Sequence, residues 1–183
     1  EHILLVIDEA YGEFADGSDF PVTDLVDRGN TIVLRTFSKA HGLASARVGW
    51  GLFPQDIGTE VRKLIIPSSI SSASDAMANA AMLDQAYMRE TCDLTAQERN
   101  RFAGRVRKTG LTCTESHTNF VLIQFPSTDQ ALRADAALRK VGIVMRGMGG
   151  YALPHCLRAT IAYEETMILA GDTLQAWAGQ ELC

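Results

Sequence analysis

Hydrophobic positions in the first half of the chain fall into short runs separated by polar loops, a pattern that predicts strands. Ile3 to Ile7 is an uninterrupted run of isoleucine, leucine and valine, typical of a strand buried on both faces of a parallel sheet. A polar, glycine-containing loop over Gly12 to Pro21 and a short helix over Val22 to Arg28 are expected next. Thr31 to Thr36 predicts a second buried strand, and Val48 to Phe53 a third. Strands that alternate with helical segments indicate an α/β layer architecture.

The pattern changes after Pro67, where a serine-rich stretch with a candidate N-cap (Ser68 to Ser74) precedes longer helical segments. The predicted helices span Asp75 to Met88, Thr91 to Lys108, Thr128 to Lys140 and Glu164 to Gly179, and the predicted strands span Phe120 to Phe125, Ile143 to Arg146 and Leu157 to Ala162. We therefore predict two domains, residues 1–90 with an α/β arrangement and residues 91–183 with an α+β arrangement.

Composition narrows the class of protein. Of the 183 residues, 46% are hydrophobic and 21% are charged, as in an ordinary soluble globular protein. The formal net charge of −5 argues against a basic face that binds nucleic acid. No apolar run approaches the roughly 20 residues of a membrane helix, so no membrane association is expected. The four cysteines and four histidines lack metal-ligand spacing, which favours reduced thiols, no metal site and a cytoplasmic location.

The start of the chain is abrupt. Glu1 and His2 lead directly into the first predicted strand, with neither an initiating methionine nor a signal peptide. Natural domains seldom begin in this way, so we expect the chain to be part of a longer protein.

Two carboxylates follow the first predicted strand. Asp8 and Glu9 come directly after Ile7, at the end of the strand where open α/β sheets bind ligands. A solvated acidic turn would give the same pattern. So would the magnesium site of an ATPase, but the G-x-x-x-x-G-K-[ST] loop that such a module needs does not occur in this sequence.

A second polar cluster follows the second predicted strand. Thr36, Ser38 and Lys39 come at its end, a glycine loop follows, and Arg47 comes next. Hydroxyl groups together with a guanidinium are suited to a phosphate, and a lysine amine can form a Schiff base with a carbonyl. Each residue alone is typical of a solvated surface, but together they indicate a site for an anionic ligand that also needs an amine.

Five motifs in a consistent order carry a resemblance to a known family. They are Asp8-Glu9-Ala10-Tyr11, Thr36-Phe37-Ser38-Lys39-Ala40 with Gly42-Leu43-Ala44, Thr118-Asn119-Phe120-Val121, Gly142-Ile143-Val144-Met145-Arg146, and Leu153-Pro154-His155-Cys156-Leu157-Arg158-Ala159-Thr160. The chain resembles the fold-type I aminotransferases that depend on pyridoxal phosphate (PLP), and most closely the histidinol-phosphate aminotransferase group. It departs from the group at Ser45 and Ala46, where the family has Gly-Leu, and at Trp50, where it has Tyr or Phe.

The resemblance implies an α/β fold of the aspartate aminotransferase type. Residues 1–90 would be the C-terminal part of a large PLP-binding domain whose sheet is mostly parallel, and residues 91–183 a small α+β C-terminal domain. The chain would be the C-terminal half of a homodimeric enzyme that transaminates histidinol phosphate with 2-oxoglutarate or glutamate, in histidine biosynthesis. Other fold-type I aminotransferases, or decarboxylases, acting on aromatic or phosphorylated amino acids share these motifs and remain alternatives.

Roles for individual residues also follow from the resemblance. Lys39 would carry PLP as a Schiff base and act as the general base of the proton shift. Asp8 would pair with the pyridine nitrogen, and Tyr11 would hydrogen-bond the phenolic oxygen of the cofactor. The residues expected to bind the cofactor phosphate are Thr36, Ser38 and Arg47.

Three residues of the second half would bind substrate. Arg158 would form a bidentate pair with the α-carboxylate of an amino acid such as glutamate. Arg146 is a candidate for the distal phosphate or carboxylate, and Asn119 would lie near the substrate. His41, although close to Lys39 in sequence, is expected to be a loop histidine without a catalytic role.

Members of the resembled family are about twice as long as this chain. Without the other half, the large sheet would have unpaired edges and uncovered apolar surface. We therefore expect the chain alone to have little or no transaminase activity, to bind PLP weakly and to self-associate.

Overall fold

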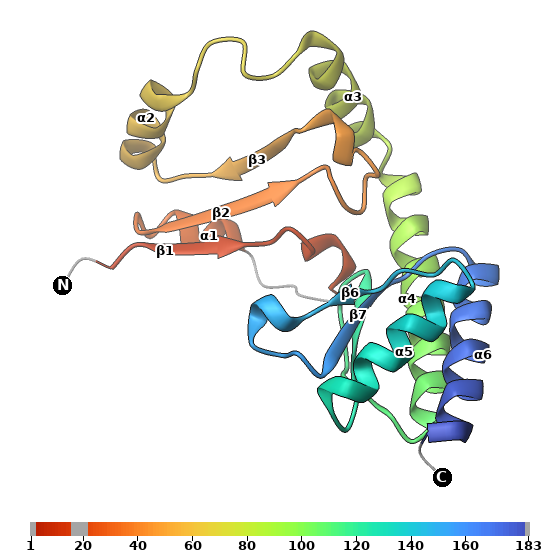
Figure 1. The fold of residues 1–183 in the computed structure, drawn as a ribbon. Coiled ribbons are helices and arrows are strands. Elements are labelled where there is room, and N and C mark those ends of the chain that lie inside the picture. Colours follow the sequence, from red (N-terminus) through yellow and green to blue (C-terminus); the bar gives the residue numbers. More distant parts are fainter. Residues whose placement is uncertain (1–2, 16–21, 182–183) are drawn as a thin grey trace. The chain divides into compact units, whose positions relative to one another are not determined.

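The protein is represented by a computed structural model that describes residues 3–15 and 22–181 (Figure 1). Part of the predicted loop Gly12 to Pro21 lies outside the described residues, as does Cys183. The chain divides into two compact units, Glu1–Cys92 and Asp93–Cys183, and each unit has its own sheet. That these units are the large and small domains of an aminotransferase stays a prediction.

The first unit contains a three-stranded sheet in the order β1-β2-β3, drawn from red to orange in Figure 1. Strand β1 (Leu5–Asp8) is parallel to β2 (Thr31–Thr36), and β3 (Gly49–Leu52) is antiparallel to β2. The predicted second strand is confirmed, and the third is confirmed with slightly shorter bounds. In β2 the first three residues are buried, as expected for the central strand.

The prediction that the first strand is buried on both faces is wrong. Strand β1 lies at the edge of the sheet, where β2 is its only partner among the described residues. Leu5 and Val6 are 46% and 51% exposed, and Ile3 and Leu4, which precede the strand, are also exposed. An apolar run is buried only if other layers cover it, and these exposures show that the described residues leave most of this strand uncovered.

The helices of the first unit follow local capping signals. Helix α1 (Val22–Val26) ends two residues before the predicted end at Arg28, and Gly29 in the left-handed region follows it. Helix α3 (Ser72–Leu83) begins where the Ser71 hydroxyl accepts the amide of Ser74 at 3.1 Å. Two short 3-10 helices, η1 (Gly12–Phe14) and η2 (Ala44–Ala46), shape the loops after β1 and β2.

Two features of the first unit differ from the sequence prediction. Helix α2 (Gln55–Leu64) was not predicted, although Ile57, Val61 and Leu64 have helical spacing. The predicted helix over Asp75 to Met88 is divided at Asp84, which ends α3. The Asp84 carboxylate accepts the amide of Tyr87 at 3.0 Å and thereby caps a new helix, α4 (Gln85–Lys108).

The second unit has an antiparallel sheet in the order β4-β5-β7-β6. The strands are β4 (Thr112–Cys113), β5 (Phe120–Gln124), β6 (Arg146–Gly147) and β7 (Cys156–Thr160), and the helices beside α4 are α5 (Thr128–Lys140) and α6 (Glu164–Glu181). A 3-10 helix, η3 (Gly149–Tyr151), lies between β6 and β7. Side chains alternate along β5, and buried Val121 and Ile123 share one core with Phe102 of α4, Leu138 of α5 and Leu174 of α6.

One predicted strand of the second unit is misplaced. Pairing with β7 begins only at Arg146, whereas the sequence predicted a strand from Ile143. The Ile143 amide instead donates to Leu138 O at 3.0 Å, and the Gly142 amide donates to Arg139 O at 3.1 Å. These bonds form a Schellman C-cap with Gly142 at φ +80°. The Ile143 amide therefore caps α5 and is not available for pairing with a neighbouring strand.

None of the helices among the described residues is both long and apolar enough to span a bilayer. The same residues contain no group of three or more His, Cys, Asp and Glu side chains arranged to hold a metal ion.

Candidate active site

The parallel pairing of β1 with β2 brings six of the predicted site residues to one edge of the first sheet. Asp8 is the last residue of β1, and Thr36 is the last residue of β2. Parallel strands end at the same edge, so the loops that follow them meet there. Strand β3 starts at this edge, with Gly49 paired to Thr36. A Cβ on Gly49 would lie 2.8 Å from Arg35 O, so glycine permits this close approach of the two backbones.

Tyr11 and Lys39 come from the two different loops and meet at this edge. Lys39 Nζ lies 5.2 Å from the centroid of the Tyr11 ring, within the distance of a cation–π contact. The lysine is half-buried, and its neighbours Phe37 and Ala40 are buried at 4% and 0% exposure. The Gly42 amide donates to Lys39 O at 2.9 Å, which closes a turn directly after the lysine. The loop is therefore anchored on both sides of Lys39.

Thr36, Ser38 and Arg47 form a cluster of hydroxyl and guanidinium groups. The Ser38 amide donates to Thr36 Oγ1 at 3.1 Å, and Thr36 Oγ1 donates to Ser38 Oγ at 2.9 Å. Arg47 Nη1 lies 3.5 Å from Ser38 Oγ and donates to Ala44 O at 2.8 Å. Arg47 adopts a left-handed conformation with φ 54°, unusual for a residue with a side chain. A guanidinium beside two hydroxyl groups is a donor set that fits a phosphate.

Asp8 and Glu9 have different environments, although they are neighbours in sequence. The Asp8 carboxylate is exposed and accepts the Ala10 amide at 3.0 Å. The Glu9 carboxylate is bound by Arg35, at 2.8 Å. Within residues 3–15 and 22–181, Asp8 forms no ion pair, so its charge stays available at the edge of the sheet.

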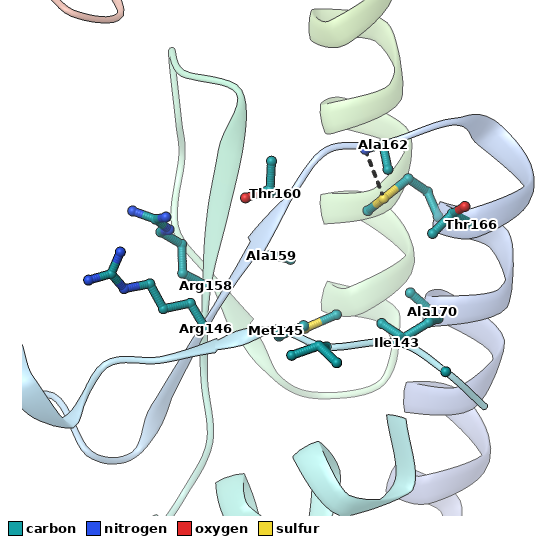
Figure 2. Close-up of a pocket in the computed structure, with 12 residues that line it drawn as sticks. Ile143, Met145, Arg146, Arg158, Ala159, Thr160, Ala162, Thr166 and Ala170 are labelled. Atoms are coloured by element: carbon teal, nitrogen blue, oxygen red, sulfur yellow. Dashed lines mark hydrogen bonds between the residues drawn. The ribbon is translucent and has the colours of Figure 1, made fainter. Parts of the chain in front are cut away.

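The second unit presents a pair of arginines on its sheet. Arg146 of β6 lies directly opposite Arg158 of β7, and Figure 2 shows both side chains extending in the same direction. Arg158 Cζ lies 4.7 Å from the Phe120 ring centroid, and Arg146 Cζ lies 5.5 Å from that of Tyr151. Neither guanidinium forms an ion pair with another described residue, and the buried Nε of Arg158 has no hydrogen-bond partner among them. Like charges directly opposite each other are destabilising, so this arrangement favours an anionic ligand.

A cavity of about 280 Å³ adjoins the arginine pair (Figure 2). Its apolar wall includes Met145, Met167 and Ala170. The Ala162 amide lies 3.3 Å from Met167 Sδ, which ties the start of α6 to the end of β7. Figure 2 shows both arginine side chains extending away from Met145 and Ala170, so their guanidinium groups point away from this apolar wall.

The surroundings of Asn119 and His41, two further residues named from the sequence, do not by themselves indicate a role. Asn119 is half-buried directly before β5, and its carbonyl accepts the Ile161 amide at 2.9 Å. His41 does lie in a loop but is buried, with its ring centroid 5.0 Å from that of Phe37. Its Nδ1 atom has no hydrogen-bond partner in the described part of the chain.

Sequence reasoning missed two arginines beside these residues. Arg35 binds Glu9 next to the candidate cofactor residues, and buried Arg99 donates to Thr118 O at 2.8 Å, one residue before Asn119. The only sequence signal for Arg35 is its charge within an otherwise apolar strand, and Arg99 lies in a strongly charged helix where nothing distinguishes it.

The fold and these site residues together define a class of protein. The chain belongs to the class I and II aminotransferase family, whose model matches residues 1–169. It is 39% identical over 183 residues to a histidinol-phosphate aminotransferase of Rhodopseudomonas palustris (strain BisB5), covering 98% of this chain and 50% of that protein. It is 40% identical over 165 residues to a histidinol-phosphate aminotransferase of Jannaschia sp. (strain CCS1), covering 90% and 46%.

A solved structure agrees with these relatives. The crystal structure of histidinol-phosphate aminotransferase from Sinorhizobium meliloti in complex with pyridoxal-5'-phosphate matches with a TM-score of 0.87 and 33% identity, over 97% of this chain and 49% of that one. The resemblance and the fold class predicted from the sequence are therefore confirmed. The chain spans about half the length of the relatives it matches.

Proposed function

We propose that this chain carries the PLP-binding lysine and the substrate-binding arginines of an aminotransferase. The observation that carries the proposal is the meeting of Lys39, Tyr11 and the Thr36–Ser38–Arg47 cluster at one edge of the first sheet. An amine beside an aromatic hydroxyl and a phosphate-binding donor set is what an aldehyde that bears a phosphate requires. Family membership and the PLP complex of the Sinorhizobium meliloti relative support the proposal.

Each residue at this edge has a role that follows from its chemistry. PLP, when bound, supplies an electron-withdrawing ring that stabilises negative charge on the substrate carbon. Lys39 Nζ would hold the cofactor covalently and, once released, would take up and return the proton that moves during transamination. The Asp8 carboxylate would keep a proton on the pyridine nitrogen, and the Tyr11 hydroxyl would donate to the phenolic oxygen. The phosphate would be bound by Thr36, Ser38 and Arg47.

We further propose histidinol phosphate and 2-oxoglutarate or glutamate as the substrates. A phosphate monoester and a dicarboxylate each carry about two negative charges at neutral pH, and Arg146 and Arg158 supply two positive charges side by side. Arg158 would bind the α-carboxylate of glutamate, and Arg146 the distal phosphate or carboxylate. Asn119, held before β5, would lie near the substrate. The names of the two curated relatives support this choice.

The chain by itself is expected to have little or no transaminase activity and to bind PLP weakly. Strand β1, which presents Asp8, is an edge strand with exposed apolar side chains, so the sheet that supports the cofactor residues is incomplete. Activity would belong to the longer enzyme, acting as a homodimer.

Reductive trapping tests the proposal. The chain is mixed with PLP and reduced with borohydride, and the modified lysine is mapped by peptide mass spectrometry. Selective labelling of Lys39, lost in Lys39→Ala and retained in Lys63→Ala, is the expected result. Lys63 is a suitable control because it belongs to the same unit and is 63% exposed. Labelling spread over surface lysines would mean that the site does not form in this chain, and the same mapping on the longer enzyme would then decide the role of Lys39.

A further inference from the structure

Arg35 is the centre of an ion-pair cluster beside the candidate cofactor residues. Its Nε donates to Glu9 Oε2 at 2.8 Å, and its Nη2 lies 2.8 Å from the same oxygen. Its Nη1 lies 3.9 Å from Glu13 Oε1. Glu9 directly follows Asp8, and Arg35 directly precedes Thr36. The ion pair therefore joins the two chain segments that present the candidate cofactor residues.

The packing around this ion pair restricts its geometry. The side chains of Arg35, Glu9 and Glu13 are only 29%, 19% and 7% exposed. Arg35 Cζ lies 5.6 Å from the ring centroid of Trp50 on β3. A Cβ on Gly12 would lie 3.2 Å from Glu9 Cβ, so Gly12 packs closely against the side chain that Arg35 binds. A shielded, two-point contact of this kind orients its partners more strongly than an exposed ion pair does.

The segment that Glu9 anchors is the one that presents Tyr11. The Gly12 amide donates to Glu9 O at 2.9 Å, and the Phe14 amide donates to Tyr11 O at 3.1 Å. The turn thus begins at the residue whose side chain Arg35 binds. Movement of Glu9 would displace the Tyr11 ring from Lys39 Nζ.

We propose that Glu9 and Arg35 are positioning residues, whose ion pair holds the Asp8–Tyr11 segment against Lys39 before the cofactor binds. The ion pair preorganises the Asp8–Tyr11 segment for ligand binding. Less conformational entropy is then lost when a ligand binds. The inference deepens the proposed function and rests on it, because it assigns the pair to the edge that would receive PLP.

Amide hydrogen exchange of the whole chain, without cofactor, tests the positioning role directly. In Glu9→Gln and in Arg35→Gln, the amides of Gly12 and Phe14 are expected to exchange roughly tenfold faster, because each variant loses one charged hydrogen bond. Exchange in β2, at Val33, is expected to stay unchanged. The charge-reversed double variant Glu9→Arg/Arg35→Glu should restore slow exchange. Equal acceleration in β2 and the turn, or no acceleration in the turn, would overturn the proposal.

The matched control is Glu60→Gln. It removes an ion pair with Lys63 in the same unit, whose side chains are 69% and 63% exposed. This variant is expected to leave exchange at Gly12 and Phe14 unchanged. Acceleration there would mean that any loss of charge loosens the turn, which contradicts a specific role for Glu9.

Trapping of PLP at limiting concentration tests the link to the cofactor. The borohydride-fixed yield at Lys39 is expected to fall roughly tenfold in Glu9→Gln and Arg35→Gln, and to recover in the charge-reversed variant. An unchanged yield in both single variants would overturn the link. Absence of Lys39 labelling in the unmodified chain would instead show that the cofactor site does not form in this chain, and the exchange measurement would still decide the positioning role.

Discussion

Arg146 and Arg158 face each other across β6 and β7 without a carboxylate between them in the described residues. Two guanidinium groups so placed repel each other in the free protein. Binding of a ligand with two negative charges relieves this repulsion, because each guanidinium group can then pair with one negative charge of the ligand. The arginine pair therefore lowers the stability of the free unit and raises its affinity for such a ligand.

Substitution of one arginine should therefore stabilise the free unit. Arg146→Gln removes the repulsion and is expected to raise the free energy of unfolding by about 0.2–1 kcal/mol, measured by urea denaturation. Arg139→Gln is the matched control, because it removes a favourable pair with Asp135 at 2.6 Å on α5 and should lower stability by roughly 0.3–0.5 kcal/mol. Equal losses in the two variants would show that Arg146 is not under repulsion.

Glycine at position 49 is required by the approach of two backbones. In Gly49→Ala the new Cβ would lie 2.8 Å from Arg35 O, so β3 must shift, at a cost of about 1–3 kcal/mol. Gly104→Ala on α4 meets no atom within 4 Å and is expected to stabilise the chain by roughly 0.5–1 kcal/mol. Thermal unfolding of the two variants measures both effects, and a neutral Gly49→Ala would show that β3 is loosely placed.

Two buried thiols should make stability depend on alkaline pH. Burial raises the pKa of Cys113, against the lowering effect of Arg107, and burial also raises the pKa of Cys156. The unfolded chain therefore loses these protons first, so stability is fully present below the unfolded thiol pKa of about 8.5 and falls as pH rises above it. Urea denaturation at pH 7 and pH 9.5 should show the decrease, and Cys113→Ala/Cys156→Ala should show less of it.

The exposed strand at the edge of the first sheet is expected to drive self-association. Val6 is 51% exposed on an unpaired edge, and a lysine there would blunt it, as charged residues do on natural edge strands. Val6→Lys should shift the sedimentation profile toward monomer with a change in unfolding free energy within about 0.5 kcal/mol. Ile168→Lys, at a residue 41% exposed on α6, is the control, and an equal shift in that variant would exclude the edge as the cause.

The sequence by itself determined the family and named the candidate site residues. Lys39 and its flanking hydroxyl groups are contiguous, and contiguous motifs can be recognised without a structure. Helix α5 and strand β2 were also predicted with their observed bounds, because the C-terminal Gly142 and the mostly apolar run of Thr31–Thr36 are local signals. Such signals act within a few residues along the chain, so the tertiary structure does not alter them.

The tertiary structure decided everything that depends on which segments meet. The ion pair of Glu9 with Arg35 joins residues 26 positions apart, and the opposition of Arg146 and Arg158 depends on the register of β6 with β7. The exposure of β1 likewise depends on what covers it, and its apolar sequence would be the same in the centre of a sheet. A hydrophobic pattern specifies which face prefers burial, but only the packing of distant segments determines whether that face is buried.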